Sequence, residues 1–156
     1  MLLSVERTRP DQSNSEMDTK SINILLVEDD AVDVMTVQRA FKKSKVSNPL
    51  HIAGNGLEAL DLLRSPENPF RNSRCLILLD LNMPKMNGIE FLKSLREDPE
   101  FHQTPVIVLT TSDQEKDRVE AYNLHVAGYI LKPVTFAKFV EVVTILNHYW
   151  TLCEFP

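Results

Sequence analysis

The chain of 156 residues, of which 43% are hydrophobic and 25% are charged, has the length and composition of one globular domain. Its net charge of -5 argues against nucleic acid as the primary ligand, because phosphate binding requires clustered lysines and arginines. No apolar stretch suits a membrane span or an export signal, and two cysteines offer no disulfide framework, so we expect a cytoplasmic protein without membrane partners.

Three segments of unequal size divide the chain. Residues 1–20 are polar and contain a Ser/Asn/Asp cluster without periodicity, which predicts a flexible N-terminal arm. Hydrophobic periodicity then extends over 21–150 and predicts a single folded domain. A short tail, 151–156, follows the last predicted helix.

The first predicted strand, an apolar run over 22–27, ends in acidic residues. Glu28 and Asp29 follow it directly, and Asp30 can cap a helix over about 31–44. Acids at this turn argue against a nucleotide- or flavin-binding module, because such modules hold a phosphate anion there on a loop rich in Gly or Ser/Thr.

A second, weaker strand is expected over 49–53, at the periphery of the sheet. Asn55 and Glu58 form a capping-box pattern that starts the helix behind it. Residues 65–74 contain two prolines and predict a loop, which is long for a connection in a compact α/β unit.

The third predicted strand is the most informative stretch, because four apolar residues, 76–79, continue directly into Asp80. An unbroken apolar run, here bounded by Pro84 and Gly88, is typical of a central strand buried on both faces. Asp80 is therefore expected at the carboxyl edge of a sheet, where open α/β folds bind their ligands. Asn87 is expected to cap the following helix.

Two further strands complete the pattern. The apolar run over 105–109 ends in Thr110, and the strand predicted over 126–131 ends at Lys132. Between them, a capping-box pattern from Ser112 to Glu115 predicts the start of a helix over about 113–124. The apolar stripe of that helix is thin, which implies weak docking on the sheet, and consists of Val119 and Tyr122.

Thr135 caps a last helix, expected to end near residue 149, that has two apolar faces. The face expected to pack on the sheet comprises Phe136, Phe139, Val140 and Val143. The second face comprises Val142, Ile145 and Tyr149. Because a helix that covers a small sheet needs only one apolar face, we expect the second to form a homodimer contact. The alternative is that the tail folds back over it with Trp150, Leu152 and Phe155.

The alternation of strands and helices predicts an α/β fold with a five-stranded parallel sheet and helices on both faces. Right-handed crossovers bring all strand ends to one edge of the sheet. The residues expected to converge there are Glu28, Asp29, Asp80, Thr110 and Lys132.

Three carboxylates, a hydroxyl and an ammonium in one place suit phosphoryl transfer. Crowded carboxylates repel each other unless a cation lies among them, and Mg²⁺ prefers such hard oxygen ligands. A carboxylate can attack phosphorus to form an aspartyl phosphate, while a lysine and a hydroxyl stabilise the transferred group.

The motifs ILLVEDD, LLDLNMPKMNG, PVIVLTTS and GYILKP stand in the order and spacing of one family. From about Ile22 to Leu146 the sequence resembles the receiver domain of two-component response regulators. This resemblance implies a flavodoxin-like, CheY-like fold with strand order 2-1-3-4-5 and a cis peptide bond between Lys132 and Pro133. It also implies a signalling switch phosphorylated by a histidine kinase, which catalyses only its own phosphorylation and dephosphorylation and is otherwise not an enzyme.

The resemblance assigns roles to particular residues. Asp80 is implied as the phospho-acceptor, with Thr110 and Lys132 as partners of the phosphoryl group. The residues implied for the Mg²⁺ site are Glu28, Asp29, Asp80 and Asn82, the last through its backbone carbonyl. The implied switch pair consists of Thr110 and Tyr129.

A finer resemblance concerns the stand-alone regulators of bacterial, especially cyanobacterial, phytochrome histidine kinases. It rests on the loop at 65–74, on residues 98–101 and 121–124, and on the aromatic residues 148–150. No output domain is expected after the last helix. The expected partners are therefore a phytochrome kinase and, through residues 113–149, a second copy of the chain.

Two alternative functions remain. One shares the aspartyl-phosphate chemistry, and the other shares the fold. A Mg²⁺-dependent phosphatase of the haloacid-dehalogenase type needs a second Asp two residues after the first as general acid, and here that residue is Asn82. A receiver that is never phosphorylated and serves only as a scaffold would not need the complete set of acids, Thr110 and Lys132.

Overall fold

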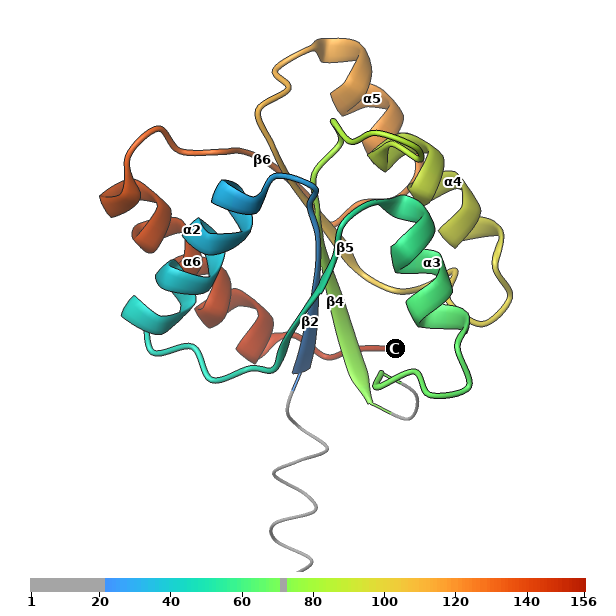
Figure 1. The fold of residues 1–156 in the computed structure, drawn as a ribbon, viewed down its shortest axis with the longest axis horizontal. Coiled ribbons are helices and arrows are strands. Elements are labelled where there is room, and N and C mark those ends of the chain that lie inside the picture. Colours follow the sequence, from blue (N-terminus) through green and yellow to red (C-terminus); the bar gives the residue numbers. More distant parts are fainter. Residues whose placement is uncertain (1–21, 71–72) are drawn as a thin grey trace, which may run out of the picture.

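The computed structural model describes residues 22–70 and 73–156. The predicted N-terminal arm, 1–20, and residues 71–72 of the predicted loop lie outside the described residues. The described elements are, in chain order, β2 (Ile22–Val27), α2 (Ala31–Lys43), β3 (Leu50–Ala53), α3 (Gly56–Arg64), β4 (Arg74–Leu79), α4 (Gly88–Glu97), β5 (Val106–Thr110), α5 (Glu115–Asn123), β6 (Gly128–Leu131) and α6 (Phe136–Leu152) (Figure 1).

The five strands form one parallel sheet in the order β3-β2-β4-β5-β6. This is the predicted order 2-1-3-4-5, so the predicted fold is confirmed. The apolar runs of β2, β4 and β5 lie in the middle of the sheet and are buried on both faces, because helices cover both sides. The weaker strand β3 lies at one edge and is only partly buried, as predicted.

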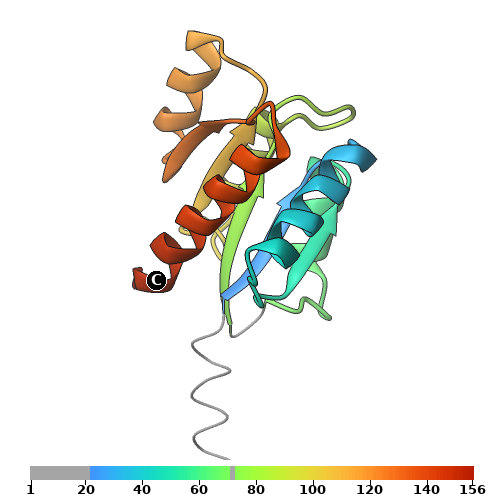
Figure 2. The same cartoon turned by 90° about the vertical axis from the view of Figure 1, so that its left-hand side faces the viewer.

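Successive residues of the central strands point to opposite faces of the sheet and build two separate cores. Ile24 and Leu26 belong to the core beneath α2 and α6, whereas Leu25 and Val27 belong to the core beneath α3, α4 and α5. Figure 1 shows these two sets of helices on either side of the sheet, and Figure 2 shows α2 and α6 side by side on one face. No helix within the described residues is long and apolar enough to cross a membrane.

Most predicted helix starts are confirmed, because each cap satisfies N–H groups that have no partner inside the helix. The side chain of Asp30 accepts hydrogen bonds from two N–H groups of α2. At α4 the capping box is complete, with side-chain to backbone bonds in both directions between Asn87 and Glu90. The other confirmed caps are Asn55 for α3 and Thr135 for α6.

The predicted start of α5 is wrong. This helix begins at Glu115, after Gln114, whose side chain makes no capping bond. The backbone N–H of Ser112 instead donates to the Thr110 hydroxyl at 3.3 Å, and its side chain donates to Asp117 at 2.6 Å. Ser112 is therefore engaged with the end of β5 and cannot form the reciprocal box with Glu115.

Weak docking of α5 is confirmed, but the predicted contacts are not the ones that hold it. The side chains of Val119 and Tyr122 are each about half exposed. Only Ala121 is buried among the residues of this helix. A single methyl group buries little apolar surface, so α5 gains less from packing than its neighbours do.

The last helix differs from its prediction in length and in its first turn. It ends at Leu152 because Trp150 is fully buried, with its ring centroid 6.1 Å from that of Phe41 on α2. Phe136 does not pack on the sheet but stays partly exposed, with the Arg39 guanidinium 5.2 Å from its ring centroid. This position allows a cation–π contact between α2 and α6.

The tail does not cover the second apolar face of α6. Phe155 is partly buried against the core beneath α2 and α6. Ile145 nevertheless remains 66% exposed and Tyr149 remains 48% exposed, while Val142 is partly buried. The alternative in which the tail shields this face is therefore wrong, and an apolar surface remains open to solvent.

Candidate functional site

The sheet register brings four strand ends to one edge. Val27 of β2 pairs with Leu79 of β4, and the N–H of Asp80 donates to the Val27 carbonyl at 3.0 Å. At the far side of the site, the Lys132 N–H donates to the Thr110 carbonyl at 2.8 Å. The predicted convergence at the carboxyl edge is therefore present.

Three carboxylates form a cluster at this edge. One oxygen from each of Glu28, Asp29 and Asp80 lies within 4.8 Å of the others. Glu28 and Asp80 are buried, and Asp29 is exposed, so the cluster opens to solvent through Asp29. Negative charges this close repel each other, and a cation placed among them would relieve the repulsion.

The ammonium group of Lys132 partly neutralises this cluster. Its Nζ donates to Glu28 Oε1 at 2.6 Å and to Asp33 Oδ2 at 2.8 Å, and it lies 3.7 Å from Asp80 Oδ2. Although burial lowers the pKa of Lys132, the hydrogen bonds that it donates to Asp33 and Glu28 raise that pKa overall. The lysine is therefore positively charged in the site.

Asp33 was not predicted to lie at this edge, because only the acids directly after β2 belong to the strand-end pattern. It lies in the first turn of α2, four residues after Asp29. Since α2 starts at the carboxyl edge of the sheet, an acid in its first turn stays close to that edge. The signal that would have identified it is its place three residues after the predicted cap Asp30, which puts it in the first turn of the helix.

The environment of Glu28 favours a bound cation. The pKa of its carboxyl group is raised to about 7, because burial and the charge of Asp80, which raise it, outweigh the hydrogen bond from Lys132, which lowers it. Its ionised form thus depends on nearby positive charge. Hard carboxylate oxygens with one side open to water fit Mg²⁺, which retains several water ligands. The residues present therefore fit the predicted metal.

The loop after β4 is held close to Asp80. The N–H of Asn82 lies 3.5 Å from Asp80 Oδ1, and the N–H of Gly88 donates to the Leu81 carbonyl at 3.0 Å. A Cβ atom on Gly88 would lie 2.6 Å from the Asp80 carbonyl oxygen and 2.7 Å from Leu81 Cα. Only glycine allows this close approach of backbone to backbone, which places Asn82 beside the acids.

A chain of hydrogen bonds connects Asp80 to the segment before α5. The fully buried Thr110 hydroxyl donates to Asp80 Oδ1 at 2.7 Å and accepts from the Ser112 N–H. The Tyr129 hydroxyl donates to the Ser112 carbonyl at 2.8 Å. The two residues predicted as a switch pair are thus linked through Ser112, and Tyr129 already reaches the segment between β5 and α5.

Lys132 makes these contacts with a trans peptide bond to Pro133. The expected cis bond is wrong for this structure, which has no cis peptide bond among its described residues. The trans form is intrinsically preferred even before proline, and here it already brings the ammonium group to Glu28 and Asp33.

Replacement of Asp29 with alanine is expected to weaken Mg²⁺ binding by about tenfold or more, which corresponds to about 1.4 kcal/mol. Removal of one of three crowded charges should also stabilise the metal-free protein by up to about 1 kcal/mol. Calorimetric Mg²⁺ titration and thermal unfolding without metal measure the two effects. Asp61→Ala, which removes an exposed acid from α3, is the matched control. An unchanged Mg²⁺ titration for Asp29→Ala would show that Asp29 is not a ligand.

Residues 24–144 match the family model of the response regulator receiver domain. The chain belongs to this family. The match covers every strand end that contributes to the site, from Glu28 to Lys132.

Similar receiver proteins come from distant organisms. The response regulator Rcp1 of the cyanobacterium Synechocystis is 38% identical over 129 residues, which are 81% of this chain and 87% of Rcp1. The probable methanogenesis regulatory protein FilR2 of Methanothrix harundinacea is 36% identical over 127 residues, 81% of this chain and 82% of FilR2. The matched region therefore covers more than four fifths of each relative.

Two solved structures share the fold of this receiver domain. The phosphorylated cyanobacterial phytochrome response regulator RcpA has a TM-score of 0.78 and 35% sequence identity, covering 87% of this chain and 99% of that one. The Mn²⁺-bound form of Rcp1 has a TM-score of 0.73 and 36% identity, with the same coverage.

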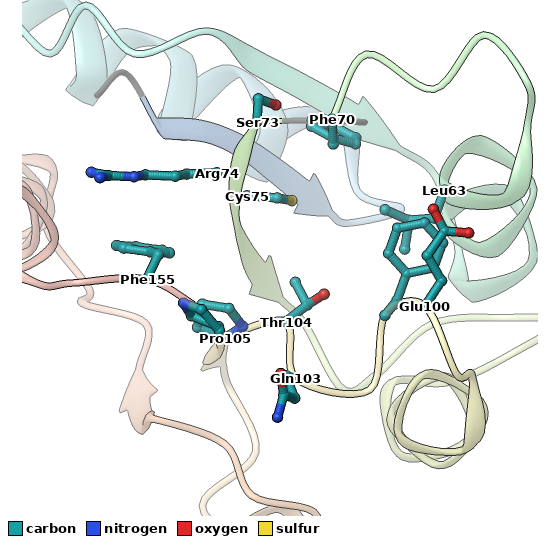
Figure 3. Close-up of a pocket in the computed structure, with 12 residues that line it drawn as sticks. Leu63, Phe70, Ser73, Arg74, Cys75, Glu100, Gln103, Thr104, Pro105 and Phe155 are labelled. Carbon is teal, nitrogen blue, oxygen red and sulfur yellow. The ribbon is translucent and has the colours of Figure 1, made fainter. Parts of the chain in front are cut away.

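A cavity of about 420 Å³ lies at the opposite end of the sheet (Figure 3). It adjoins the amino-terminal ends of β4 and β5, and its lining includes Phe70, Arg74, Cys75, Thr104, Pro105 and Phe155. Burial raises the pKa of the Cys75 thiol to about 12, so this group is protonated and unreactive at neutral pH. No residue of the carboxylate cluster lines this cavity, which is separate from the receiver site.

Proposed function

We propose that this receiver domain accepts a phosphoryl group on Asp80 from a histidine kinase and passes the signal on through protein contacts in the cytoplasm. The observation that supports this best is the environment of the Asp80 carboxylate. One of its oxygens accepts from Thr110, and the other faces Lys132 at 3.7 Å. The same carboxylate is buried within a cluster of carboxylates that would hold a cation.

In the forward reaction, an Asp80 oxygen attacks the phosphorus of a phosphohistidine and forms a new P–O bond. The N–P bond breaks, and its electron pair returns to the imidazole nitrogen. Lys132 and Thr110 each stabilise a phosphoryl oxygen. Glu28, Asp29, Asp80 and the Asn82 carbonyl would hold a divalent cation, which reduces the repulsion between nucleophile and phosphoryl group when bound.

In the return reaction, a water oxygen attacks the same phosphorus. The P–O bond to Asp80 breaks, the carboxylate is restored, and inorganic phosphate leaves as H2PO4⁻, which carries both protons of the water. Both steps occur on the chain's own side chain, which distinguishes this switch from an enzyme acting on external phosphoesters. Asn82, two residues after Asp80, cannot act as the general acid of a phosphatase.

Exposed apolar side chains beside the site support a protein as the phosphoryl donor. Val32 and Met35 lie on α2, while Val134 and Phe136 follow shortly after Lys132. Phe136 is the first residue of α6, and Val134 lies just before this helix. Helices α2 and α6 pack next to each other (Figure 2). A protein that buries such side chains can present its phosphohistidine to Asp80.

A phytochrome histidine kinase is the proposed donor. The support is the similarity over nearly the whole domain to RcpA, a phytochrome response regulator. FilR2 is almost as similar in sequence as Rcp1, so sequence identity alone does not select the sensor. The choice of a phytochrome rests on the structural match.

A phosphotransfer assay tests this proposal. Autophosphorylated histidine kinases with radiolabelled phosphate, a phytochrome kinase among them, are mixed with the receiver domain and Mg²⁺. Rapid transfer of label from the phytochrome kinase, and slow transfer from the others, is the expected result. Failure of every kinase and of acetyl phosphate to label the chain would contradict the proposed function. Transfer from a different kinase alone would contradict only the phytochrome assignment.

We also propose that the second face of α6 forms a homodimer contact. The exposed side chains of Ile145 and Tyr149 and the partly buried Val142 leave an apolar surface that the tail does not cover. A two-fold pair of identical surfaces is the commonest way in which oligomers bury such a patch. The contact is expected within residues 113–149, next to the weakly docked α5.

Ile145→Glu is expected to convert the dimer to a monomer, because it places a charge in the centre of this surface. Sedimentation velocity measures the change, and phosphorylation of Asp80 by acetyl phosphate should persist. Ala137→Glu, which adds the same charge at an exposed position of α6 about two turns away, is the control. A wild-type protein that sediments as a monomer with and without a phosphoryl mimic would exclude the dimer.

A further inference from the structure

Lys132 has an acidic partner that lies outside the carboxylate cluster. The cluster contains Glu28, Asp29 and Asp80, whereas Asp33 belongs to the first turn of α2. The Asp33 side chain is 38% exposed, in contrast to 9% for Lys132. The ammonium group is therefore held between a buried carboxylate on one side and a partly hydrated one on the other.

The three acidic partners of the Lys132 ammonium group lie at different distances from it. Glu28 at 2.6 Å and Asp33 at 2.8 Å are within hydrogen-bond distance, but Asp80 at 3.7 Å is not. The positive charge that should stabilise a phosphoryl group on Asp80 is thus bound elsewhere in this conformation. For Lys132 to bond a phosphoryl oxygen with full strength, one of the two shorter contacts has to loosen.

Asp33 is the partner that can release Lys132 at lower cost. Its carboxylate already contacts water, and the N-terminus of α2 stabilises its negative charge without the lysine. Glu28 is nearly inaccessible to water, so losing Lys132 would deprive a buried carboxylate of its hydrogen-bonded positive partner. The exchange of Lys132 between Asp33 and a phosphoryl group is therefore the cheaper of the two rearrangements.

We infer that Asp33 is a positioning residue that holds Lys132 away from Asp80 and thereby lowers the affinity of the site for a phosphoryl group. This inference rests on the proposed function. Asp33 does not touch the reacting atoms and acts only through Lys132. Asp33 determines the free energy needed to move Lys132 to a phosphoryl group. It therefore also determines how strongly the phosphorylated state is favoured.

Binding of beryllium fluoride, a non-covalent phosphoryl mimic, in saturating Mg²⁺ tests the inference. Asp33→Asn should bind it about threefold more tightly than wild type, the size expected for a partly exposed ion pair. Asp33→Glu, which restores the charge, should return the affinity towards the wild-type value. Asp61→Asn is the control for the change in net charge, and ¹⁹F NMR reports the bound fraction directly.

The same substitution in a Lys132→Gln background separates two explanations. If Asp33 acts through the lysine, Asp33→Asn changes the affinity in the wild-type background and leaves it unchanged in the Lys132→Gln background. Equal tightening in both backgrounds would mean a general electrostatic effect and would overturn the inference, as would unchanged or weaker binding by Asp33→Asn. If the wild type does not bind the mimic at all, the proposed function fails, and the inference fails with it.

Discussion

Asp80→Asn is expected to abolish phosphorylation and to leave the fold intact. The amide has no anionic oxygen with which to attack phosphorus, so the reaction has no nucleophile at this position. Asparagine is nearly the same size, and its carbonyl oxygen can still accept the hydrogen bond from Thr110 that Asp80 Oδ1 accepts at 2.7 Å. Removal of one charge also relieves repulsion with Glu28 and Asp29.

Mass spectrometry of the intact chain after incubation with acetyl phosphate and Mg²⁺ measures this effect. The wild type should gain one phosphoryl group, and Asp61→Asn should behave like it, since that acid lies on α3 outside the cluster. Circular dichroism and thermal unfolding verify that Asp80→Asn is folded. An asparagine variant that is phosphorylated at the wild-type rate would disprove Asp80 as the acceptor.

Thr110→Ala should leave phosphorylation possible but remove most of the structural response to it. The hydroxyl is the connection between Asp80 and Ser112, and Ser112 is bonded to Tyr129. A shift of the active population from rare to dominant needs roughly 5 kcal/mol of differential interaction. A hydrogen bond to a charged group contributes about 1.5–3 kcal/mol, so its loss should reduce the population ratio by roughly 10- to 100-fold.

Hydrogen–deuterium exchange of α5, with and without beryllium fluoride, measures the response. In the wild type the exchange of residues 115–123 should change on addition of the mimic, because few buried contacts hold this helix. Thr110→Ser, which keeps the hydroxyl, should preserve most of the change. A Thr110→Ala protein that shows the full wild-type change in exchange would disprove the proposed connection from Asp80 through Thr110 to α5.

The sheet and most of the site were predictable because their determinants are local in sequence. Apolar runs that end in Asp80, Thr110 and Lys132 identify buried strands and the groups at their ends, and parallel topology then brings those groups together. Tight pairing of Asp33 with Lys132 was not predicted, because the two residues are 99 positions apart and neither belongs to a local pattern with the other.

The errors in α5 and α6 have the same origin. Ser112 has the sequence of a helix cap, but its N–H already donates to the Thr110 hydroxyl and its carbonyl already accepts from the Tyr129 hydroxyl. Phe136 lies on the apolar face of its helix, yet it stays partly exposed beside Arg39, whereas Trp150 in the last turn is buried against Phe41. Periodicity identifies a face, but it does not reveal which of its members the neighbouring helix covers.

The two cores on opposite faces of the sheet separate the residues that we propose contact the phosphoryl donor from those that we propose respond to phosphorylation. Helix α2, which carries Asp33, covers one face, whereas Tyr129 and α5 pack against the other. Substitutions on the two faces that do not touch Asp80 are distant and should combine additively. A lineage can therefore exchange its sensor without altering its target, and acquire a new target without losing its sensor.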